Sequence, residues 1–211
     1  MIKPYIKKTI LLVIVILLMA VIITACSDKK TIEDAEVSSN TQNPKVEIEM
    51  QDGGKMVLEL YPELAPKTVE NFINLAKSGF YDGLKFHRIV KGFMIQGGDP
   101  NGDGTGGADK NIKGEFAQNG FSKNTLKHTK GVISMARRPD PNSASCQFFI
   151  VHGDATFLDG QYAAFGMLIE GEETLDKIAD TPVDKHPSGE MSIPKVDVVI
   201  KKITVMEDSE K

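Results

Sequence analysis

From residue 44 onward, apolar residues recur mainly at every second position, and this alternation constrains the fold more than any other feature. Residues 45–50 alternate charged and apolar side chains, and residues 56–60 again place apolar side chains on one face. Successive side chains of a β-strand point to opposite sides, so a period of two predicts strands with one buried face. The turn sequence Asp-Gly-Gly at 52–54 joins the two runs into a predicted hairpin.

Two segments show the 3.6-residue period of a helix instead. In 66–78, apolar residues stand at i, i+3, i+4 and i+7, with a proline in the first turn and Gly79 just past the end. Proline suits the start of a helix and glycine suits its stop. A second, shorter helix is predicted over 172–179, with its apolar residues on one side.

Further strand-like runs follow along the chain, and the last one changes phase after Ile200, which indicates a bulge or bend. These runs lie at 85–90, 93–96, 132–136, 147–151, 163–169 and 196–205. Strands and helices do not alternate as they do in βαβ units. The pattern therefore favours a mainly β fold, an antiparallel barrel whose ends are covered by two helices.

Charge and cysteine content exclude several functional classes. The chain has 25 Lys+Arg against 29 Asp+Glu, so we expect no nucleic-acid partner. Two cysteines do not make a disulfide scaffold, and Cys and His are not paired at zinc spacing. Residues 99–104 match the first half of an EF-hand loop, but the twelfth position is Lys110, where calcium needs a bidentate Glu. We therefore expect no metal and no cofactor.

The first 25 residues are typical of a signal peptide. Three lysines precede an uncharged, largely apolar run of 15 residues at 9–23, whereas a spanning helix needs about 20 residues. The run ends in Ile-Thr-Ala-Cys at 23–26, which resembles a bacterial lipoprotein cleavage box with Cys26 as the lipidated new N-terminus. A short transmembrane anchor is the alternative. Both interpretations place the remaining chain outside the cytoplasm.

After the lipidated cysteine, residues 26–43 are predicted to be a flexible polar tether, spanning roughly 20–25 Å as a random coil. Removing residues 1–25 takes away three lysines and no acid, which leaves 22 basic and 29 acidic residues, a net charge of −7. A domain of this charge gains nothing from anionic headgroups, so we expect the lipid on Cys26 to hold the domain 44–211 at the cell membrane.

Four segments combine apolar and polar residues in ways that core packing does not explain. In 86–90, period two places Phe86, Arg88 and Val90 on one face. A guanidinium among apolar neighbours is costly unless something satisfies it. The other three segments are 92–99, 131–137 and 145–150.

Together these segments resemble the cyclophilin family of peptidyl-prolyl cis-trans isomerases, over about 44–206. The resemblance implies a closed eight-stranded antiparallel barrel capped by two helices, and rotation about Xaa–Pro bonds as the activity. The run Ser-Met-Ala-Arg at 134–137 looks like the bacterial branch. The motifs that carry the resemblance are Phe-His-Arg-Ile-Val at 86–90, Gly-Phe-Met-Ile-Gln-Gly-Gly-Asp at 92–99, Gln-Phe-Phe-Ile at 147–150 and Phe-Leu-Asp-Gly at 157–160.

The resemblance also implies a role for each residue of a substrate groove. Arg88 would be catalytic, donating a hydrogen bond to the amide nitrogen as the bond twists, an interaction that the planar ground state lacks. The proline ring would lie on apolar side chains, those of Phe93, Met94, Phe149 and Leu158. The substrate chain would be held by a second set of residues, namely Gln96, Ala136, Arg137, Gln147, Phe157 and Tyr162.

The sequence departs from many family members at two of these positions. Phe157 stands where they have Trp, and Arg137 stands where they have Asn. Because that Trp matters for cyclosporin binding, the sequence does not predict strong inhibition by cyclosporin. Two further residues are assigned structural roles, His87 on the face opposite Arg88 and Cys146 as a small buried hydrophobe.

The expected partners are proline-containing unfolded or exported polypeptides, bound by a monomer that assists extracytoplasmic folding. A peptide-binding module or holdase chaperone using the same groove is the first alternative. Arg88 favours the isomerase, because binding alone would not require a cation in an apolar groove. A calcium-stabilised surface adhesin is the second alternative.

Overall fold

The computed structural model describes residues 42–206 of the chain. The predicted signal peptide, the lipidation of Cys26 and most of the tether lie outside the described residues. Within 42–206, no helix is both long enough and apolar enough to cross a membrane.

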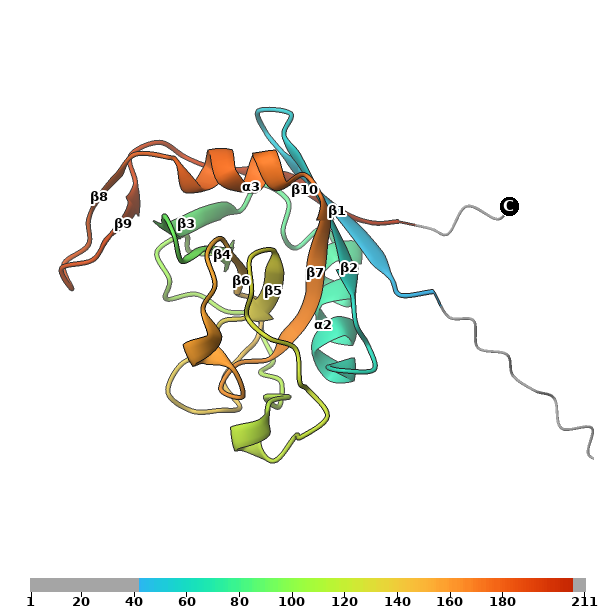
Figure 1. Cartoon of the computed structure of the whole chain (residues 1–211). Coiled ribbons are helices and arrows are strands. Elements are labelled where there is room, and N and C mark those ends of the chain that lie inside the picture. The colour runs from blue at the N-terminus through green and yellow to red at the C-terminus, as the bar shows by residue number, and fades with distance from the viewer. Residues whose placement is uncertain (1–41, 207–211) are drawn as a thin grey trace, which may run out of the picture. The chain divides into compact units, whose positions relative to one another are not determined.

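The described residues form one eight-stranded sheet in which every neighbouring pair of strands is antiparallel (Figure 1). The strand order is β10-β1-β2-β7-β5-β6-β4-β3. The predicted first hairpin is confirmed, with Val46 opposite Leu58. The strands are β1 (Lys45–Met50), β2 (Lys55–Leu60), β3 (Lys85–Val90), β4 (Met94–Asp99), β5 (Val132–Met135), β6 (Phe148–Val151), β7 (Ala164–Glu170) and β10 (Ile200–Met206).

The prediction of a closed barrel is wrong, because the sheet is a half-barrel that stays open between its edge strands β3 and β10. One isolated bridge, Lys85 to Val199, links the two edges. The N–H of Ile200 also donates to the carbonyl of Leu84 at 2.8 Å. β10 begins at Ile200 and continues along β1 from there, so contact with β3 stops before a ladder can form.

The change of phase predicted in the last strand is confirmed. Glu49 of β1 faces Lys202, whereas the next residue, Met50, faces Ile200. Lys201 is therefore the extra residue of a bulge. The bulge lets Ile200 and Ile203 both be buried although they stand three positions apart.

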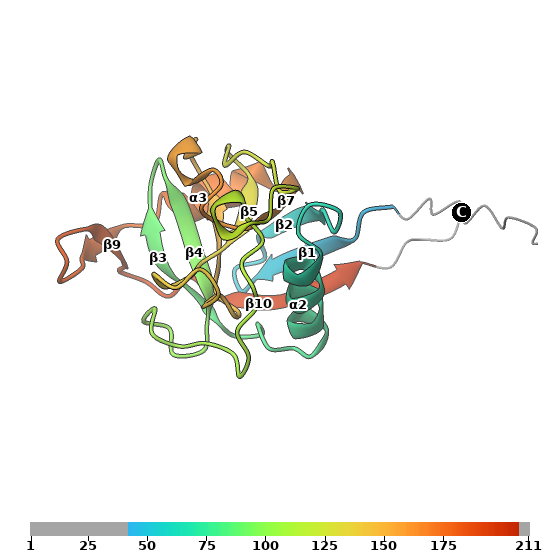
Figure 2. The same cartoon turned by 90° about the horizontal axis from the view of Figure 1, so that it is seen from below.

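The two α-helices of the described residues are α2 (Pro66–Lys77) and α3 (Glu172–Ala179), within one residue of the predicted ranges. α3 lies above the sheet in Figure 1, and α2 lies in front of β10 when the molecule is seen from below (Figure 2). The carboxylate of Glu115 accepts hydrogen bonds from the first-turn N–H groups of Lys67 and Thr68, at 3.0 and 2.8 Å. A negative group there satisfies orphan N–H groups and complements the helix dipole.

A second, two-stranded sheet was not predicted. It is a hairpin of β8 (Val183–Lys185) and β9 (Met191–Pro194), which projects beside β3 in both views (Figures 1 and 2). Its strands are short and largely exposed, so the apolar alternation that reveals a strand is weak here. The turn between the strands, 186–190, contains a Pro-Ser-Gly sequence.

The buried apolar residues of 42–206 form two clusters on opposite faces of the central strands. The larger cluster contains an aromatic group around Phe148, whose ring lies edge-on to Phe72 with centroids 5.4 Å apart. The next residue along β6, Phe149, belongs to the smaller cluster together with Met94 and Leu158. Strand alternation thus places one phenylalanine in the core and its neighbour toward the second face.

Candidate active site

A groove of about 330 Å³ lies over the second cluster and gathers most of the predicted site residues. Gln147, the remaining predicted substrate residue, lines an adjoining pocket together with Gln96, Ala136 and Arg137. The structure therefore brings the predicted residues of 42–206 into one continuous surface. The residues that line the groove are Arg88, Phe93, Met94, Gln96, Ala136, Arg137, Phe149, Phe157, Leu158 and Tyr162.

A bulge in β3 directs Arg88 into this groove. Phe86 faces Gly97 of β4, yet Arg88 faces Gln96, so one residue of β3, His87, is extra. The prediction that Phe86 and Arg88 share a face is therefore wrong: Phe86 is 1% exposed in the core, whereas Arg88 lines the groove. Bulges re-aim side chains in this way.

The prediction for His87 also needs correction, because the same bulge turns it toward the side of Arg88. The two residues line one cleft of about 710 Å³ between the Gly-rich loop at 102–105 and the β8–β9 hairpin. Burial lowers the pKa of His87, and neither ring nitrogen has a hydrogen-bond partner among the described residues.

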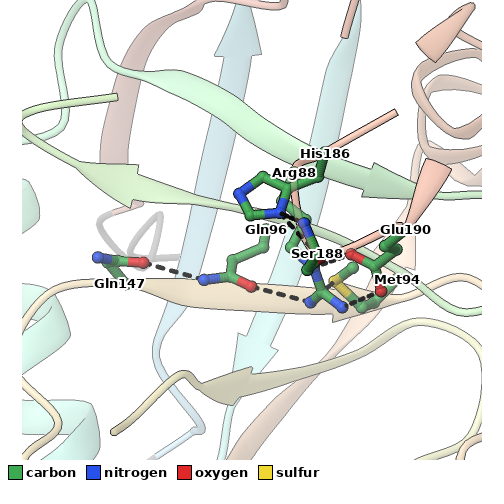
Figure 3. Close-up of polar contacts among 7 residues, drawn as sticks. All are labelled: Arg88, Met94, Gln96, Gln147, His186, Ser188 and Glu190. Carbon is green, nitrogen blue, oxygen red and sulfur yellow. Dashed lines mark hydrogen bonds and ion pairs between the residues drawn. The ribbon is translucent and has the colours of Figure 1, made fainter. Parts of the chain in front are cut away.

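Arg88 is held from two sides (Figure 3). Its Nη1 donates to Oε1 of Gln96 at 3.2 Å. On the other side, Nε and Nη2 each donate to one carboxylate oxygen of Glu190, both at 2.7 Å. The guanidinium carbon also lies 5.8 Å from the ring centroid of Phe93. Glu190 was not foreseen, because it stands 102 residues away in the sequence.

A chain of amide hydrogen bonds runs from Arg88 through Gln96 to Gln147 (Figure 3). From Gln147 it continues into the Gly-rich loop. Nε2 of Gln96 donates to Oε1 of Gln147 at 2.9 Å. Nε2 of Gln147 in turn donates to the carbonyls of Gly104 and Gly106, at 3.1 and 2.8 Å. The neighbours of each amide fix which end is the oxygen and which is the nitrogen. The nitrogen of Gln96 donates to Gln147, so its oxygen faces Arg88 and accepts from it.

The loop that receives this chain is organised by Asp99. Its carboxylate, 1% exposed, accepts hydrogen bonds from the backbone N–H groups of Asn101, Asp103 and Gly104. A Cβ on Gly106 would collide with this carboxylate, so a glycine is required there. The run that matched half an EF-hand loop thus uses its first aspartate to close the loop on itself. Among residues 42–206, no group of three possible metal ligands lies together.

The floor of the groove is apolar and fixed. Met94, Phe149 and Leu158 are at most 9% exposed. The ring of Tyr162 stands edge-on to Phe149, with centroids 5.9 Å apart. At the rim, Phe157 is 64% exposed and its ring lies 5.5 Å from that of Phe93. An apolar floor of this kind suits a ring such as that of proline.

Arg137 forms the opposite wall of the groove. Its Nε and Nη2 donate to the carbonyl of Gln161, at 3.1 and 3.0 Å, and Nη1 donates to the carbonyl of Arg138 at 2.9 Å. The guanidinium lies over the rings of Phe116 and Tyr162, at 5.2 and 4.7 Å from their centroids. Most of its donors are therefore committed to backbone carbonyls.

The structure also shows a buried polar cluster beneath the floor, which the sequence reasoning missed. His128 is 0% exposed, and its two ring nitrogens lie 3.1 Å from Asp159 Oδ1 and 3.1 Å from Ser134 Oγ. Burial lowers the pKa of His128. Ser134 is also 0% exposed, so this Asp-His-Ser set cannot reach a substrate. His128 stacks on Phe149 instead and supports the floor, with ring centroids 6.0 Å apart.

Comparison with known proteins places this geometry in a family. The sequence profile of the family described as Cyclophilin type peptidyl-prolyl cis-trans isomerase/CLD matches residues 45–205. Peptidyl-prolyl cis-trans isomerase-like 3 of Gallus gallus is 44% identical over 155 residues, which are 73% of this chain and 91% of that protein.

Two further similar proteins extend the comparison. Peptidyl-prolyl cis-trans isomerase-like 2 of Cryptococcus neoformans is 45% identical over 157 residues, which are 74% of this chain but 26% of that much longer protein. The crystal structure of a Cryptosporidium parvum cyclophilin in the presence of the dipeptide Ala-Pro matches 78% of this chain and 99% of its own, with a TM-score of 0.68 and 34% identity. The chain therefore belongs to the cyclophilin-type peptidyl-prolyl cis-trans isomerases.

Proposed function

We propose that this chain accelerates cis-trans rotation about Xaa–Pro bonds in exported polypeptides, with Arg88 as its catalytic residue. Amide resonance sets a barrier of about 18–20 kcal/mol to this rotation. The uncatalysed step takes tens to hundreds of seconds, long enough to limit folding. The observation that carries the proposal is the guanidinium of Arg88, held at the edge of a fixed apolar floor.

The chemistry requires differential binding rather than a nucleophile. As the Xaa–Pro bond twists, its nitrogen loses resonance, becomes pyramidal and regains a lone pair that can accept a hydrogen bond. An Arg88 donor meets that lone pair in the transition state and finds none in the planar ground state, so the interaction lowers the barrier. Each 1.4 kcal/mol or so of such stabilisation is worth a factor of ten in rate.

We assign the two sides of the substrate to different surfaces of the groove. The proline ring lies on Met94, Phe149 and Leu158, which are buried and packed against their neighbours. The residue before proline lies toward Gln96 and Gln147, where the adjoining pocket is polar. One side is then anchored while the other rotates.

The setting that we propose is the outer face of a bacterial cell membrane, where a lipid on Cys26 tethers a monomeric domain through residues 26–43. Support comes from the sequence: three lysines, a 15-residue apolar run, and a small-residue box ending in cysteine. Tethering there would place the enzyme where exported chains emerge unfolded.

The catalytic proposal is tested by measuring isomerisation of a short Xaa-Pro peptide with the full chain in detergent and with its Arg88→Ala variant. We expect rapid isomerisation by the parent and a loss of about 100-fold in kcat/KM in the variant, equivalent to about 2.7 kcal/mol. Circular dichroism checks that both proteins are folded. A folded parent that binds the peptide without accelerating its isomerisation would instead support the peptide-binding alternative.

The anchoring proposal has a separate test in cells. The parent should be cleaved to its mature size, incorporate labelled palmitate and sediment with membranes. The Cys26→Ser variant should give no mature-sized protein that carries the label or sediments with membranes. Equal labelling of the two proteins would contradict lipidation at Cys26. Membrane association of an unlabelled, unprocessed parent would support the transmembrane alternative.

A further inference from the structure

The β8–β9 hairpin delivers a carboxylate to the residue on which the proposed chemistry depends. We propose that Glu190 is a positioning residue for Arg88, holding the guanidinium so that its remaining N–H groups face the groove. This inference rests on the catalytic role proposed for Arg88. Glu190 does not line the groove itself; it lines the neighbouring cleft and reaches the groove through Arg88.

The contact has the geometry of a strong, oriented pair. Glu190 accepts from Nε and Nη2, the two nitrogens on one side of the guanidinium, with both donor–acceptor distances 2.7 Å. Paired hydrogen bonds of this kind fix the plane of an arginine as well as its position. The hydrogen bonds from Arg88 hold the pKa of Glu190 below its ordinary value, so the carboxylate is charged at neutral pH.

The pair also decides which donors stay available. A guanidinium has five N–H groups. Glu190 takes two of them and Gln96 takes one. Among the partners that residues 42–206 provide, Nη1 has one further contact, a weak one with the sulfur of Met94 at 3.6 Å. Apart from that weak contact, one N–H on each Nη atom is left for the twisted amide.

The turn that carries Glu190 is itself braced. The N–H of His186 donates to the carbonyl of Glu190 at 2.7 Å, and the N–H of Gly189 donates to the carbonyl of His186 at 2.8 Å. Nδ1 of His186 lies 2.8 Å from Oγ of Ser188 (Figure 3). Directly after the turn, β9 pairs with β8. The hairpin therefore presents the carboxylate from a closed turn rather than from a loose loop.

Without Glu190, Arg88 keeps Gln96 as its side-chain oxygen partner among the described residues. A long side chain held at one nitrogen samples more orientations, and fewer of them direct an N–H at the substrate nitrogen. Misplacement by a fraction of an ångström lowers the rate of the chemical step without removing any group that binds the substrate. Loss of Glu190 should therefore appear in kcat and leave KM nearly unchanged.

The variant for the test is Glu190→Gln, which keeps the shape of the side chain but replaces one acceptor oxygen with an NH₂ group. The matched control is Asp184→Asn, which removes a carboxylate from β8 of the same hairpin, where it pairs with Lys195 at 3.2 Å. Both variants and the parent are assayed as full chains in detergent on the same Xaa-Pro peptide. Arg88→Ala and the double variant Arg88→Ala/Glu190→Gln complete a cycle.

We expect Glu190→Gln to lower kcat by about tenfold with KM within about twofold of the parent, and Asp184→Asn to change neither. In the Arg88→Ala background, Glu190→Gln should cause no further loss, because its effect acts through the arginine. In ¹⁵N NMR spectra, the Arg88 Nε–H should exchange slowly in the parent and in Asp184→Asn, and rapidly in Glu190→Gln.

Three outcomes would overturn the inference. The first is unchanged activity in Glu190→Gln. The second is a gain in activity, which would show that the carboxylate restrains Arg88 instead of positioning it. The third is an equal loss of kcat on Glu190→Gln in the parent and in the Arg88→Ala background. Failure of the proposed function looks different, because Arg88→Ala would then retain the activity of the parent. An active parent, an impaired Arg88→Ala and an unimpaired Glu190→Gln would reject this inference alone.

Discussion

The two walls of the groove each carry an arginine, and the two are held in opposite ways. Arg88 is held by two side chains, the carboxylate of Glu190 and the amide of Gln96, which together occupy three of its five N–H groups. Arg137 donates its hydrogen bonds to backbone carbonyls and lies over two aromatic rings. A cation in a groove is therefore not by itself a catalytic group; what matters is which donors remain after its neighbours are satisfied.

Among the changes that compare the two walls, the largest effect is expected from replacing Arg88 by lysine, which keeps the charge and removes the planar fork. A lysine ammonium has three N–H donors but no planar fork, so it cannot donate to Glu190 and Gln96 in the arginine geometry while presenting an oriented donor to the substrate. We therefore expect kcat/KM to fall by about 30- to 100-fold. Peptide isomerisation rates measure this loss, and a melting curve checks that the variant is folded. Near-parental activity would mean that the positive charge alone suffices. It would contradict the inference that the available N–H donors distinguish Arg88 from Arg137.

A smaller effect is expected at the opposite wall. Arg137→Ala removes the bridge between Gln161 and Arg138 and the packing over Phe116 and Tyr162, so KM should rise about threefold while kcat stays near the parental value. Steady-state kinetics on one peptide series separate the two parameters. A drop in kcat as large as that of the lysine variant at position 88 would place Arg137 among the catalytic groups.

The smallest expected effect is on the stability of the fold in acid. It should come from the Arg88–Glu190 pair and not from Arg137. The pKa of Glu190 is lowered in the folded protein by Arg88, so the pair stabilises the fold above the ordinary carboxyl pKa and this contribution is lost as the pH falls through the folded value. Both partners are about one third exposed, which limits the contribution to about 0.2–1 kcal/mol.

The acid effect is measured as a difference in unfolding free energy between the parent and Glu190→Gln, by urea titration at neutral pH and near pH 3. The difference should be present at neutral pH and become smaller in acid. Arg137→Ala should keep the acid sensitivity that this pair contributes, because the hydrogen-bond acceptors of Arg137 are backbone carbonyls. A difference that stays constant with pH would show that Glu190 acts through packing rather than through charge.

Local patterns predicted much of the fold. The second helix was predicted over the residues it occupies, and the alternation in 45–50 gave the correct buried face. The β8–β9 hairpin was missed because its short, exposed strands do not show that alternation. The closed barrel was wrong because closure depends on where two edge strands diverge, and no local pattern records the path of β10 beside β3.

The candidate site divides in the same way. The family resemblance led to every residue that lines the groove, and all of these residues except Tyr162 lie within its motifs. The bulge at His87 was missed because a bulge is a property of two paired strands, and the contacts of His128 with Asp159 and of Arg88 with Glu190 join residues 31 and 102 positions apart.

By itself, the sequence determined which residue types are available for the chemistry: an arginine, two glutamines and an apolar floor, carried on strands whose buried faces follow from a period of two. Tertiary structure alone decided that a bulge at His87 directs Arg88 into the groove, that Glu190 holds it, and that Arg137 has most of its donors occupied. The physical reason is that periodicity reports on neighbours along one strand, whereas hydrogen-bond partners are set by strand pairing and by turns that meet in space.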